Sequence, residues 1–296
     1  MTTTALPAAA ATETVAPVKP KRQRTVGANI GIALIVVYCL IPFYWMVVSA
    51  FRRPEDQFSN LPVPWPISFR NFLGVFGQGV GFGRSLLNSL VVAGVTTLLT
   101  LIIGTFASYA LARLEFRFKN AVLAVIIATS MFPVISLIVP LLKLFTNNLH
   151  WINTYQAMIL PSLSFALPLA VFNLTAFFRQ LPFDLEQAAM VDGCTPGQAF
   201  RKIIIPLAAP GVFTTAIITF IAAWNEFLIA LSMVNQKQMQ TATVAISKFT
   251  GVSGSGFDQP FGTQMAAGVV VTIPLVVAVL VFQRRIIAGL TTGGVK

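Results

Sequence analysis

The sequence is poor in charged residues, which make up only 10% of its 296 positions. A soluble domain carries roughly 25% charged residues, so this chain cannot cover itself with a charged surface. Hydrophobic residues account for 56% of the chain, and the mean hydropathy is +0.79. The composition therefore predicts an integral membrane protein that is embedded in a lipid bilayer.

Cysteine and histidine are almost absent as well. The chain has two cysteines, Cys39 and Cys194, and one histidine, His150. Cys39 falls in the first apolar run and Cys194 in a polar segment, so we expect neither a disulfide nor a Cys/His metal site. The phosphate-binding pattern G-x-x-x-x-G-K-[ST] does not occur in the sequence. We therefore predict no catalytic residues, no cofactor and no metal in this chain.

The charge that is present is mostly positive, with a net value of +11. The lysines and arginines lie singly or in short groups at the ends of apolar runs. This distribution is typical of membrane topology and does not indicate a nucleic-acid-binding face. Most of them fall on the side of the chain that also holds both termini, so the positive-inside rule places both termini in the cytoplasm. Residues 1–25, rich in Ala, Thr and Pro, are expected to be a disordered cytoplasmic tail.

Long apolar runs dominate the rest of the sequence. A helix needs about 20 apolar residues to cross a bilayer core, which favours six helices over the short alternating strands of a barrel. The expected spans are Val26–Ala50, Leu86–Leu111, Ala121–Leu142, Ala157–Phe177, Val212–Met233 and Met265–Phe282. We predict an all-α multi-pass protein with an extracytoplasmic loop at 51–83, a core at 84–285 and a cytoplasmic tail at 286–296.

The expected spans contain small residues and prolines at informative positions. Gly104, Ser108 and Ala112 recur every four residues, which allows a neighbouring helix to approach closely. Four prolines interrupt the third and fourth spans, at Pro133, Pro140, Pro161 and Pro168. Such prolines either kink helices within a bundle or mark the wall of a water-filled path, and the sequence leaves both interpretations open.

One polar segment, Leu185–Pro206, separates two long apolar runs. Asp184 is a suitable N-cap for a first short helix, and Gly193 can end it in the left-handed conformation. Thr195 can cap a second helix, which would have Pro196 at its first position and Gln198 at the capping-box position. The chain would then re-enter the membrane at Pro206. Two capped helices around a tight turn favour a docking element over a plain connector.

This polar segment resembles the EAA loop of permease subunits in binding-protein-dependent ABC importers. The family pattern is E-A-A, three residues, G, nine residues, and I-x-L-P. The positions that match it here, or stand in its place, are Gln187, Ala188, Ala189, Gly193, Ile203, Ile205 and Pro206. Gln187 replaces the usual glutamate, which would pair with a basic residue of the ATPase. We therefore expect Glu186, next to it, to supply that charge, with Asp192 as a further polar residue of the loop.

Further segments resemble the carbohydrate-importer branch of this family, and the stretches Thr195–Gly211 and Ala288–Lys296 look most like its actinobacterial trehalose-type systems. Five segments carry the resemblance to the branch. These segments are Pro42–Asp56, Arg84–Leu90, Ser108–Phe116, Ala222–Leu231 and Gln283–Lys296. The resemblance implies a type I importer permease fold in a bacterial plasma membrane. It also implies a second homologous permease, two ATPase subunits that bind ATP and magnesium, and an extracytoplasmic sugar-binding protein or lipoprotein. Trehalose is the expected sugar, with maltose-type oligosaccharides or glycerol-phosphate compounds as alternatives.

Two further sets of residues are candidates, one from the resemblance and one from polar groups within the expected spans. By position, the loop before the last span would reach the binding protein through Thr250, Gly251, Ser253, Gly254 and Phe257. Candidates for the translocation path or its gate are Trp224, Asn225, Glu226, Asn88 and Asn173. Glu226 is the only acidic residue within an expected span, and an ionisable group at membrane depth indicates function. An interface or gate, a sugar contact, or a place at the outer boundary all remain open for it.

Two other classes of function are consistent with an apolar multi-span chain. A proton- or sodium-coupled transporter would need acidic or histidine relays inside the membrane, and one glutamate among six spans argues against it. A scaffold or receptor that transports nothing would not need so many proline-interrupted helices. Persistence of uptake after ATP depletion would favour the first of these, and the absence of any substrate-dependent ATP hydrolysis would favour the second.

Overall fold

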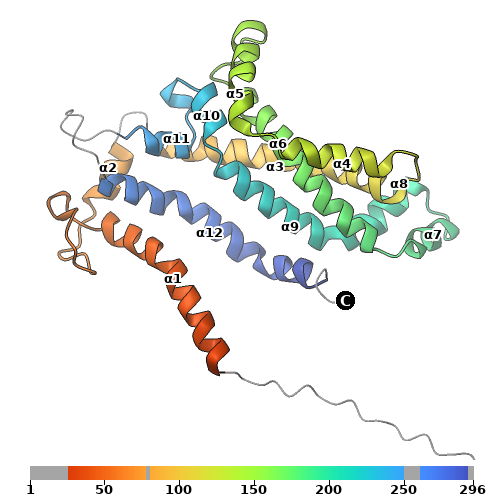
Figure 1. Cartoon of the computed structure of the whole chain (residues 1–296), viewed down its shortest axis with the longest axis horizontal. Coiled ribbons are helices and arrows are strands. Elements are labelled where there is room, and N and C mark those ends of the chain that lie inside the picture. Colours follow the sequence, from red (N-terminus) through yellow and green to blue (C-terminus); the bar gives the residue numbers. More distant parts are fainter. Residues whose placement is uncertain (1–25, 78–80, 250–260, 293–296) are drawn as a thin grey trace, which may run out of the picture. The chain divides into compact units, whose positions relative to one another are not determined.

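The computed structural model describes residues 26–77, 81–249 and 261–292, and regular structure in these ranges is entirely helical (Figure 1). The chain divides into two compact units between Tyr44 and Trp45, and the second unit holds every helix after α1. Within the described residues, five helices are long and apolar enough to cross a membrane, and one bent pair of helices is a further candidate. The prediction of an all-α membrane protein is confirmed.

The helices follow one another along the chain with short connections. They are α1 (Val26–Ala50), η1 (Pro54–Asp56), α2 (Arg70–Gly77), α3 (Phe82–Arg113), α4 (Lys119–Ser130), α5 (Val134–Lys143), η2 (Leu144–Asn148), α6 (Tyr155–Gln180), α7 (Asp184–Val191), α8 (Pro196–Ala199), η3 (Phe200–Ile204), α9 (Ile205–Trp224), α10 (Leu228–Met233), η4 (Lys237–Met239), α11 (Ala242–Ser247) and α12 (Phe261–Thr292).

The centre of the second unit is a bundle of α3, α6 and α9. The small residues of α3 make its contact with α6 close, as the sequence predicted. A side chain added at Gly104 would touch Leu174 and Ala170 of α6, and the Ser108 hydroxyl donates a hydrogen bond to the Val171 carbonyl (3.0 Å). Close backbone packing of this kind holds helices together where lipid removes the hydrophobic driving force.

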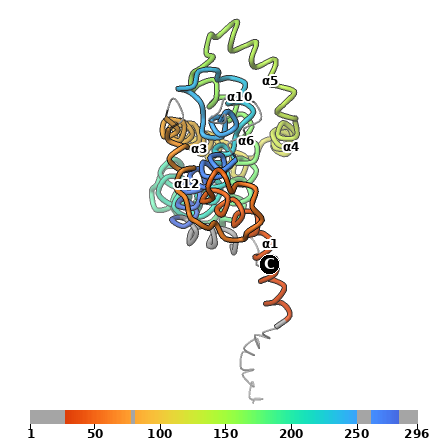
Figure 2. Tube along the Cα trace, turned by 90° about the vertical axis from the view of Figure 1, so that its left-hand side faces the viewer, coloured from red at the N-terminus to blue at the C-terminus, as the bar shows by residue number. Residues whose placement is uncertain are grey.

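The third expected span is broken. Residues Lys119–Ser130 and Val134–Asn148 meet at an angle of 85°, so α4 and α5 run in clearly different directions (Figures 1 and 2). The break falls at Met131–Pro133, because Pro133 has no N–H to continue the ladder of α4 and its extended backbone starts a new helix instead. Pro140, Pro161 and Pro168 lie inside continuous helices. Among the four prolines, only Pro133 therefore lies at a break between two helices.

The helix in place of the fifth expected span, Val212–Met233, begins earlier and ends earlier than predicted. One helical stretch, Pro196–Trp224, runs without a break through the π-helical turn η3 and past Pro206, the residue at which re-entry into the membrane is predicted. Pro206 is tolerated there because it lies at the start of α9, where the π-helical turn has already shifted the hydrogen-bond ladder. The same span ends at Trp224, and Leu228–Met233 forms the separate helix α10.

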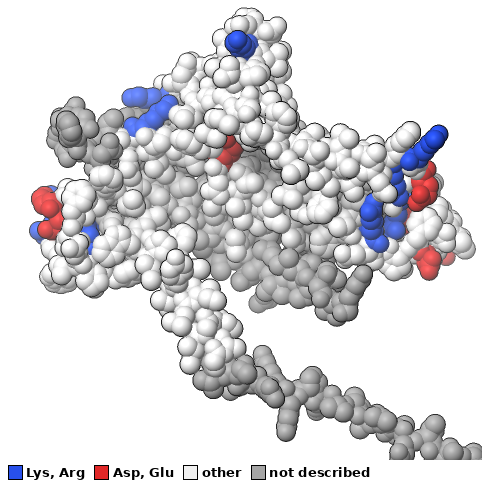
Figure 3. All heavy atoms as spheres, viewed as in Figure 1, with Lys and Arg blue, Asp and Glu red and all other residues white. Residues whose placement is uncertain are grey.

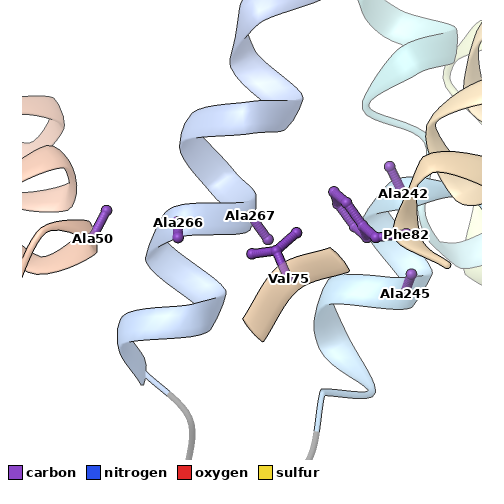
Figure 4. Packing of buried hydrophobic residues seen from close by; sticks show 7 residues of the cluster. All are labelled: Ala50, Val75, Phe82, Ala242, Ala245, Ala266 and Ala267. Atoms are coloured by element: carbon purple, nitrogen blue, oxygen red, sulfur yellow. The ribbon is translucent and has the colours of Figure 1, made fainter. Parts of the chain in front are cut away.

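The helices α2, α11 and α12 pack around a small apolar cluster near one end of α3. Ala266 and Ala267 of α12 lie between Ala50 on one side and Val75, with Phe82 behind it, on the other (Figure 4). Because the cluster is built mainly from alanines, the helix backbones approach one another closely. Helix α12 continues beyond the expected last span, Met265–Phe282, as far as Thr292.

Gly211 of α9 offers a test of the contact between α9 and α6. A Cβ atom at this position would overlap the ring of Phe177. Gly211→Ala is therefore expected to lower the thermal midpoint of the detergent-solubilised protein, since overpacking costs about 1–3 kcal/mol. The matched control is Gly94→Ala, where a new Cβ meets nothing within 4 Å. In a Phe177→Ala background, which removes the ring atoms that the new Cβ would overlap, Gly211→Ala should cost little, and an equal loss in both backgrounds would contradict this packing.

Candidate functional site

The polar segment forms a helix–turn–helix whose tight turn depends on Gly193. The amides of Asp192, Gly193 and Cys194 donate hydrogen bonds to carbonyls of the last turn of α7, at 3.0–3.1 Å. Gly193 has φ +90°, a conformation that side chains with a Cβ atom rarely adopt. The expected glycine end of the first helix is confirmed.

Of the two helix caps predicted in this segment, the structure contains one and lacks the other. Thr195 and Gln198 form the predicted capping box: the Gln198 amide donates to Thr195 Oγ1 (3.3 Å), and the Thr195 amide donates to Gln198 Oε1 (2.9 Å). The cap predicted at Asp184 is wrong. Phe183 occupies the N-cap position without a side-chain cap, and Asp184 is the first residue of α7 itself. There the carboxylate is still favourable, because it lies at the positive end of the helix.

One face of α7 is exposed along its whole length. It carries Asp184, Gln187, Ala188 and Val191, which share one side of a helix by their three- and four-residue spacing. Val191 is 87% exposed, an unusual position for a large apolar side chain. We call these four residues the α7 face. Asp192 and Gly193 continue it, whereas Ala189 is buried, Ile203 is half-buried in η3 and Pro206 is exposed on α9.

Glu186 lies on the opposite side of α7 and is only 5% exposed. Its carboxylate accepts a hydrogen bond from the Tyr109 hydroxyl and forms an ion pair with Arg113, 3.3 Å from Glu186 Oε2 to Arg113 Nε. The expectation that Glu186 replaces the missing charge of Gln187 toward a partner is therefore wrong. Both acceptor oxygens of its side chain face the interior of the same chain. The α7 face instead presents the uncharged Gln187 beside Asp184.

Sequence reasoning did not single out Tyr109 and Arg113 as functional residues. Arg113 was counted only as a topological charge, although both residues lie in the segment Ser108–Phe116 that carries the family resemblance. Arg113 also donates to the Leu181 carbonyl (3.0 Å) and stacks over the ring of Phe183, 5.5 Å from its centroid. The last turn of α3 thus binds the connection between α6 and α7 as well as α7 itself.

Glu226 lies at the break between α9 and α10. Its two carboxylate oxygens accept hydrogen bonds from the amides of Ile229 (2.7 Å) and Ala230 (3.0 Å), so it caps α10. Its backbone carbonyl accepts from the Thr243 hydroxyl of α11 (3.0 Å). Trp224 is buried against Phe220, and the Asn225 side chain donates to the Ile221 carbonyl (2.9 Å). The Trp-Asn-Glu motif therefore ends one helix and starts the next.

Glu226→Ala removes both acceptors and is expected to speed amide exchange at Ile229 and Ala230 about fivefold, since a lost cap costs about 1 kcal/mol. Glu226→Gln keeps one carbonyl acceptor and should give a smaller change. Hydrogen–deuterium exchange of the purified protein measures both. Equal exchange in the wild type and the alanine variant would show that Glu226 does not hold α10.

A cavity of about 160 Å³ lies next to this break, between α5, α6 and α9. Its polar groups are Ser162, Thr219 and Glu226, and its other lining residues are apolar. Asn88, another path candidate, lies elsewhere. It is 2% exposed, donates to the carbonyls of Gln238 and Gln240, and accepts from the Tyr155 hydroxyl. Asn88 thus lies inside a helix interface, with both polar atoms of its side chain hydrogen-bonded. Asn173 is half-buried on α6.

The residues expected to contact a binding protein, Thr250, Gly251, Ser253, Gly254 and Phe257, lie outside the described residues. Within the described residues, no group of three or more His, Cys, Asp and Glu side chains is arranged to hold a metal ion. On the face seen in Figure 3, charged side chains gather around α7 and α8, around the α2 end and near α11, and one basic side chain lies at the tip above α5. The white surface between these groups is almost uncharged, which suits contact with lipid.

Comparisons with known proteins agree on one kind of protein. The family described as binding-protein-dependent transport system inner membrane component matches residues 100–292. The trehalose transport system permease protein of Mycobacterium tuberculosis is 45% identical over 89% of this chain and 94% of its own length. The trehalose/maltose transport system permease protein of Thermococcus litoralis is 40% identical over 90% of this chain and 95% of its own.

A solved structure shows the same fold. It is a chain of a bacterial ABC transporter involved in the import of the acidic polysaccharide alginate, with a TM-score of 0.70 and 18% identity. The alignment covers 89% of this chain and 97% of that one. The polar segment, the helical fold and the close relatives lead to one conclusion. This chain belongs to the family of inner membrane components of binding-protein-dependent transport systems, as a multi-pass permease subunit of an ABC sugar importer.

Proposed function

We propose that this chain forms half of a sugar path in a bacterial plasma membrane and is driven by separate ATPase subunits that dock on the α7 face. The observation that carries the proposal is the exposed α7 face itself, held on a capped helix–turn–helix in a chain of this family. Slim and uncharged side chains at Gln187 and Ala188 suit insertion into a groove. ATP and magnesium would be bound by the two ATPase subunits, and none by this chain.

The topology that fits this proposal has six crossings, with both termini and α7 in the cytoplasm. The bent pair α4–α5 supplies the third crossing, and the other five are the long apolar helices. The positive-inside rule supports this orientation, since Arg113, Arg117, Arg179, Arg201 and Lys202 all lie near the α7 end.

A second, homologous permease subunit would complete the path. The cavity beside Glu226, at about 160 Å³, is smaller than the roughly 300–1,000 Å³ of typical ligand pockets. This cavity alone therefore offers too little space for a disaccharide. The break at Trp224–Glu226 would lie at the contact between the two permeases. There, Glu226 acts as a gate support that holds α10, and it does not act as a free sugar ligand.

Trehalose is the proposed sugar, because the two relatives compared above are named for trehalose or for trehalose and maltose transport. Maltose-type oligosaccharides and glycerol-phosphate compounds are the alternatives. The sugar would arrive on an extracytoplasmic binding protein or lipoprotein, as the description of the family implies. The loop 250–257 is the proposed contact for that protein.

Reconstitution tests the proposal. The chain is co-purified with its companion permease, its ATPase subunits and its binding protein, and ATP hydrolysis in proteoliposomes is measured with trehalose, maltose and a glycerol phosphodiester. Trehalose-loaded binding protein is expected to stimulate hydrolysis most. Stimulation only by maltose or the phosphodiester would correct the sugar. No stimulation by any of the three would contradict the proposed function and would favour a receptor.

A further inference from the structure

Helix α3 is bonded by side chains at both of its ends to segments that are far apart in the chain. Figure 1 shows α3 running between the α11 end and the α7 end of the bundle. Asn88 and Tyr109 are separated by 21 positions on one unbroken helix, which corresponds to about 30 Å along the axis. That distance is close to the thickness of a bilayer core, about 30 Å.

At one end, Tyr109 and Arg113 hold Glu186 of α7; we call these three residues the α7 clamp. The side chains of Arg113 and Glu186 are 8% and 7% exposed, so the ion pair is shielded from water. Each charge also lies at a favourable helix end, Arg113 in the last turn of α3 and Glu186 in the first turn of α7. A buried pair of this kind resists separation, because pulling it apart leaves two unpaired charges.

The ring of Tyr109 extends this clamp to the neighbouring helices. Its centroid is 4.4 Å from that of Phe200 in η3 and 6.0 Å from that of Phe178 in α6. α7 is joined to α6 and α8 only through short connections, yet its buried face is bonded to α3. A displacement of α7 should therefore move the end of α3 with it.

At the other end, α3 holds the residues that follow α10; we call these bonds the η4 clamp. Asn88 donates to the carbonyls of Gln238 (2.8 Å) and Gln240 (2.9 Å), and Ser89 accepts from the amide of Ala242 (2.8 Å). The Gln238 carbonyl accepts a second hydrogen bond, from Arg84 (3.1 Å). These bonds tie α3 to η4 and to the start of α11.

We propose that α3 moves as a rigid helix and transmits movement of α7 to residues 238–242, with Tyr109 and Asn88 as its positioning residues. The inference rests on the proposed function, in which an ATPase pushes on α7 from the cytoplasm and residues 238–242 lie on the outer side. It extends that function by naming the helix and the two clamps that would transmit the conformational change driven by ATP hydrolysis to the outer face. The chain between 242 and α12 leads directly into the loop proposed to meet the binding protein.

The test uses the reconstituted complex and Tyr109→Phe, which removes one hydroxyl and keeps the ring packed on Phe200 and Phe178. Sugar uptake should fall about tenfold, the factor expected for loss of one hydrogen bond to a charged group, while the ATPase subunits still co-purify. Tyr38→Phe, an exposed position on α1, is the matched control and should match the wild type.

A second readout separates transmission from folding. Cys39 and Cys194 are replaced by serine, and Lys237→Cys places a probe on the exposed side of η4. The maleimide reactivity of this cysteine should change when ATP and vanadate are added to the intact complex. It should not change in Tyr109→Phe, and a thermal midpoint only slightly below the control value, with the ATPase subunits still bound, would show that the variant is folded. A full change in reactivity in Tyr109→Phe, with normal uptake, would overturn the inference.

A double-mutant cycle provides the last check. Asn88→Ala weakens the η4 clamp. Combined with Tyr109→Phe, it should reduce uptake no further than the more severe single change does, because both changes interrupt transmission through the same helix. Multiplying effects would mean that the two clamps act independently and would overturn the inference. Absence of ATP-dependent uptake in the wild-type complex would instead reject the proposed function, and this inference with it.

Discussion

Replacing Gly193 by valine is expected to lower ATP-driven sugar uptake at least about fivefold. Gly193 holds φ +90° at the turn between α7 and α8, and a β-branched residue is a severe outlier there. Strained backbone of this kind costs about 1–3 kcal/mol, which shifts an equilibrium by about 5- to 150-fold. The turn should therefore open, and α7 should lose its orientation toward the ATPase. Uptake and ATP hydrolysis in the reconstituted complex measure the effect.

Gly197→Ala is the matched control for this prediction. Gly197 is also exposed and lies four residues further along, but it is helical, and a Cβ atom there meets nothing within 4 Å. The control should retain wild-type uptake. If Gly193→Val transports as well as Gly197→Ala, the turn geometry has no role in coupling.

Ala188→Trp is expected to prevent the ATPase subunits from co-purifying with the permease and to leave the fold of the chain intact. Ala188 is exposed at the centre of the α7 face, so a bulky ring meets solvent in the free chain. In the complex the same ring would block close approach of a partner, because interface centres are packed as densely as protein interiors. Affinity purification through the permease, followed by quantification of the ATPase subunits, measures this effect.

The neighbouring alanine separates docking from folding. Ala189 is 3% exposed and faces the interior, so Ala189→Trp should lower the thermal midpoint and the yield of the permease itself. Ala188→Trp should change neither. Retention of the ATPase subunits by a stable Ala188→Trp variant would show that they bind elsewhere than on the α7 face.

Much of this architecture could be predicted from residue patterns. Apolar runs located the long helices, because crossing a bilayer requires an apolar length that few other structures share. The glycine turn at Gly193 and the capping box at Thr195 follow from local chemistry, and both are present. The prediction for Gly104 and Ser108 also succeeded, since small residues at this spacing have one strong use in a membrane helix.

The predictions that failed depended on tertiary contacts. Glu186 looked like a surface charge because it stands beside polar residues, but its pairing with Arg113 involves a helix that ends 73 positions earlier in the chain. Hydropathy could not locate the sharp bend at Pro133, since both α4 and α5 are apolar. Nor could it show that Glu226 caps a new helix, because the break at Trp224 interrupts an otherwise continuous apolar run.

The source of energy for uptake is the most direct test of the account. Radiolabelled trehalose uptake is measured in proteoliposomes that contain the permease pair, the ATPase subunits and the loaded binding protein, with and without ATP and with and without an imposed proton or sodium gradient. The account predicts uptake that requires ATP and is unaffected by loss of either gradient. Uptake that continues without ATP and collapses with an ion gradient would contradict it.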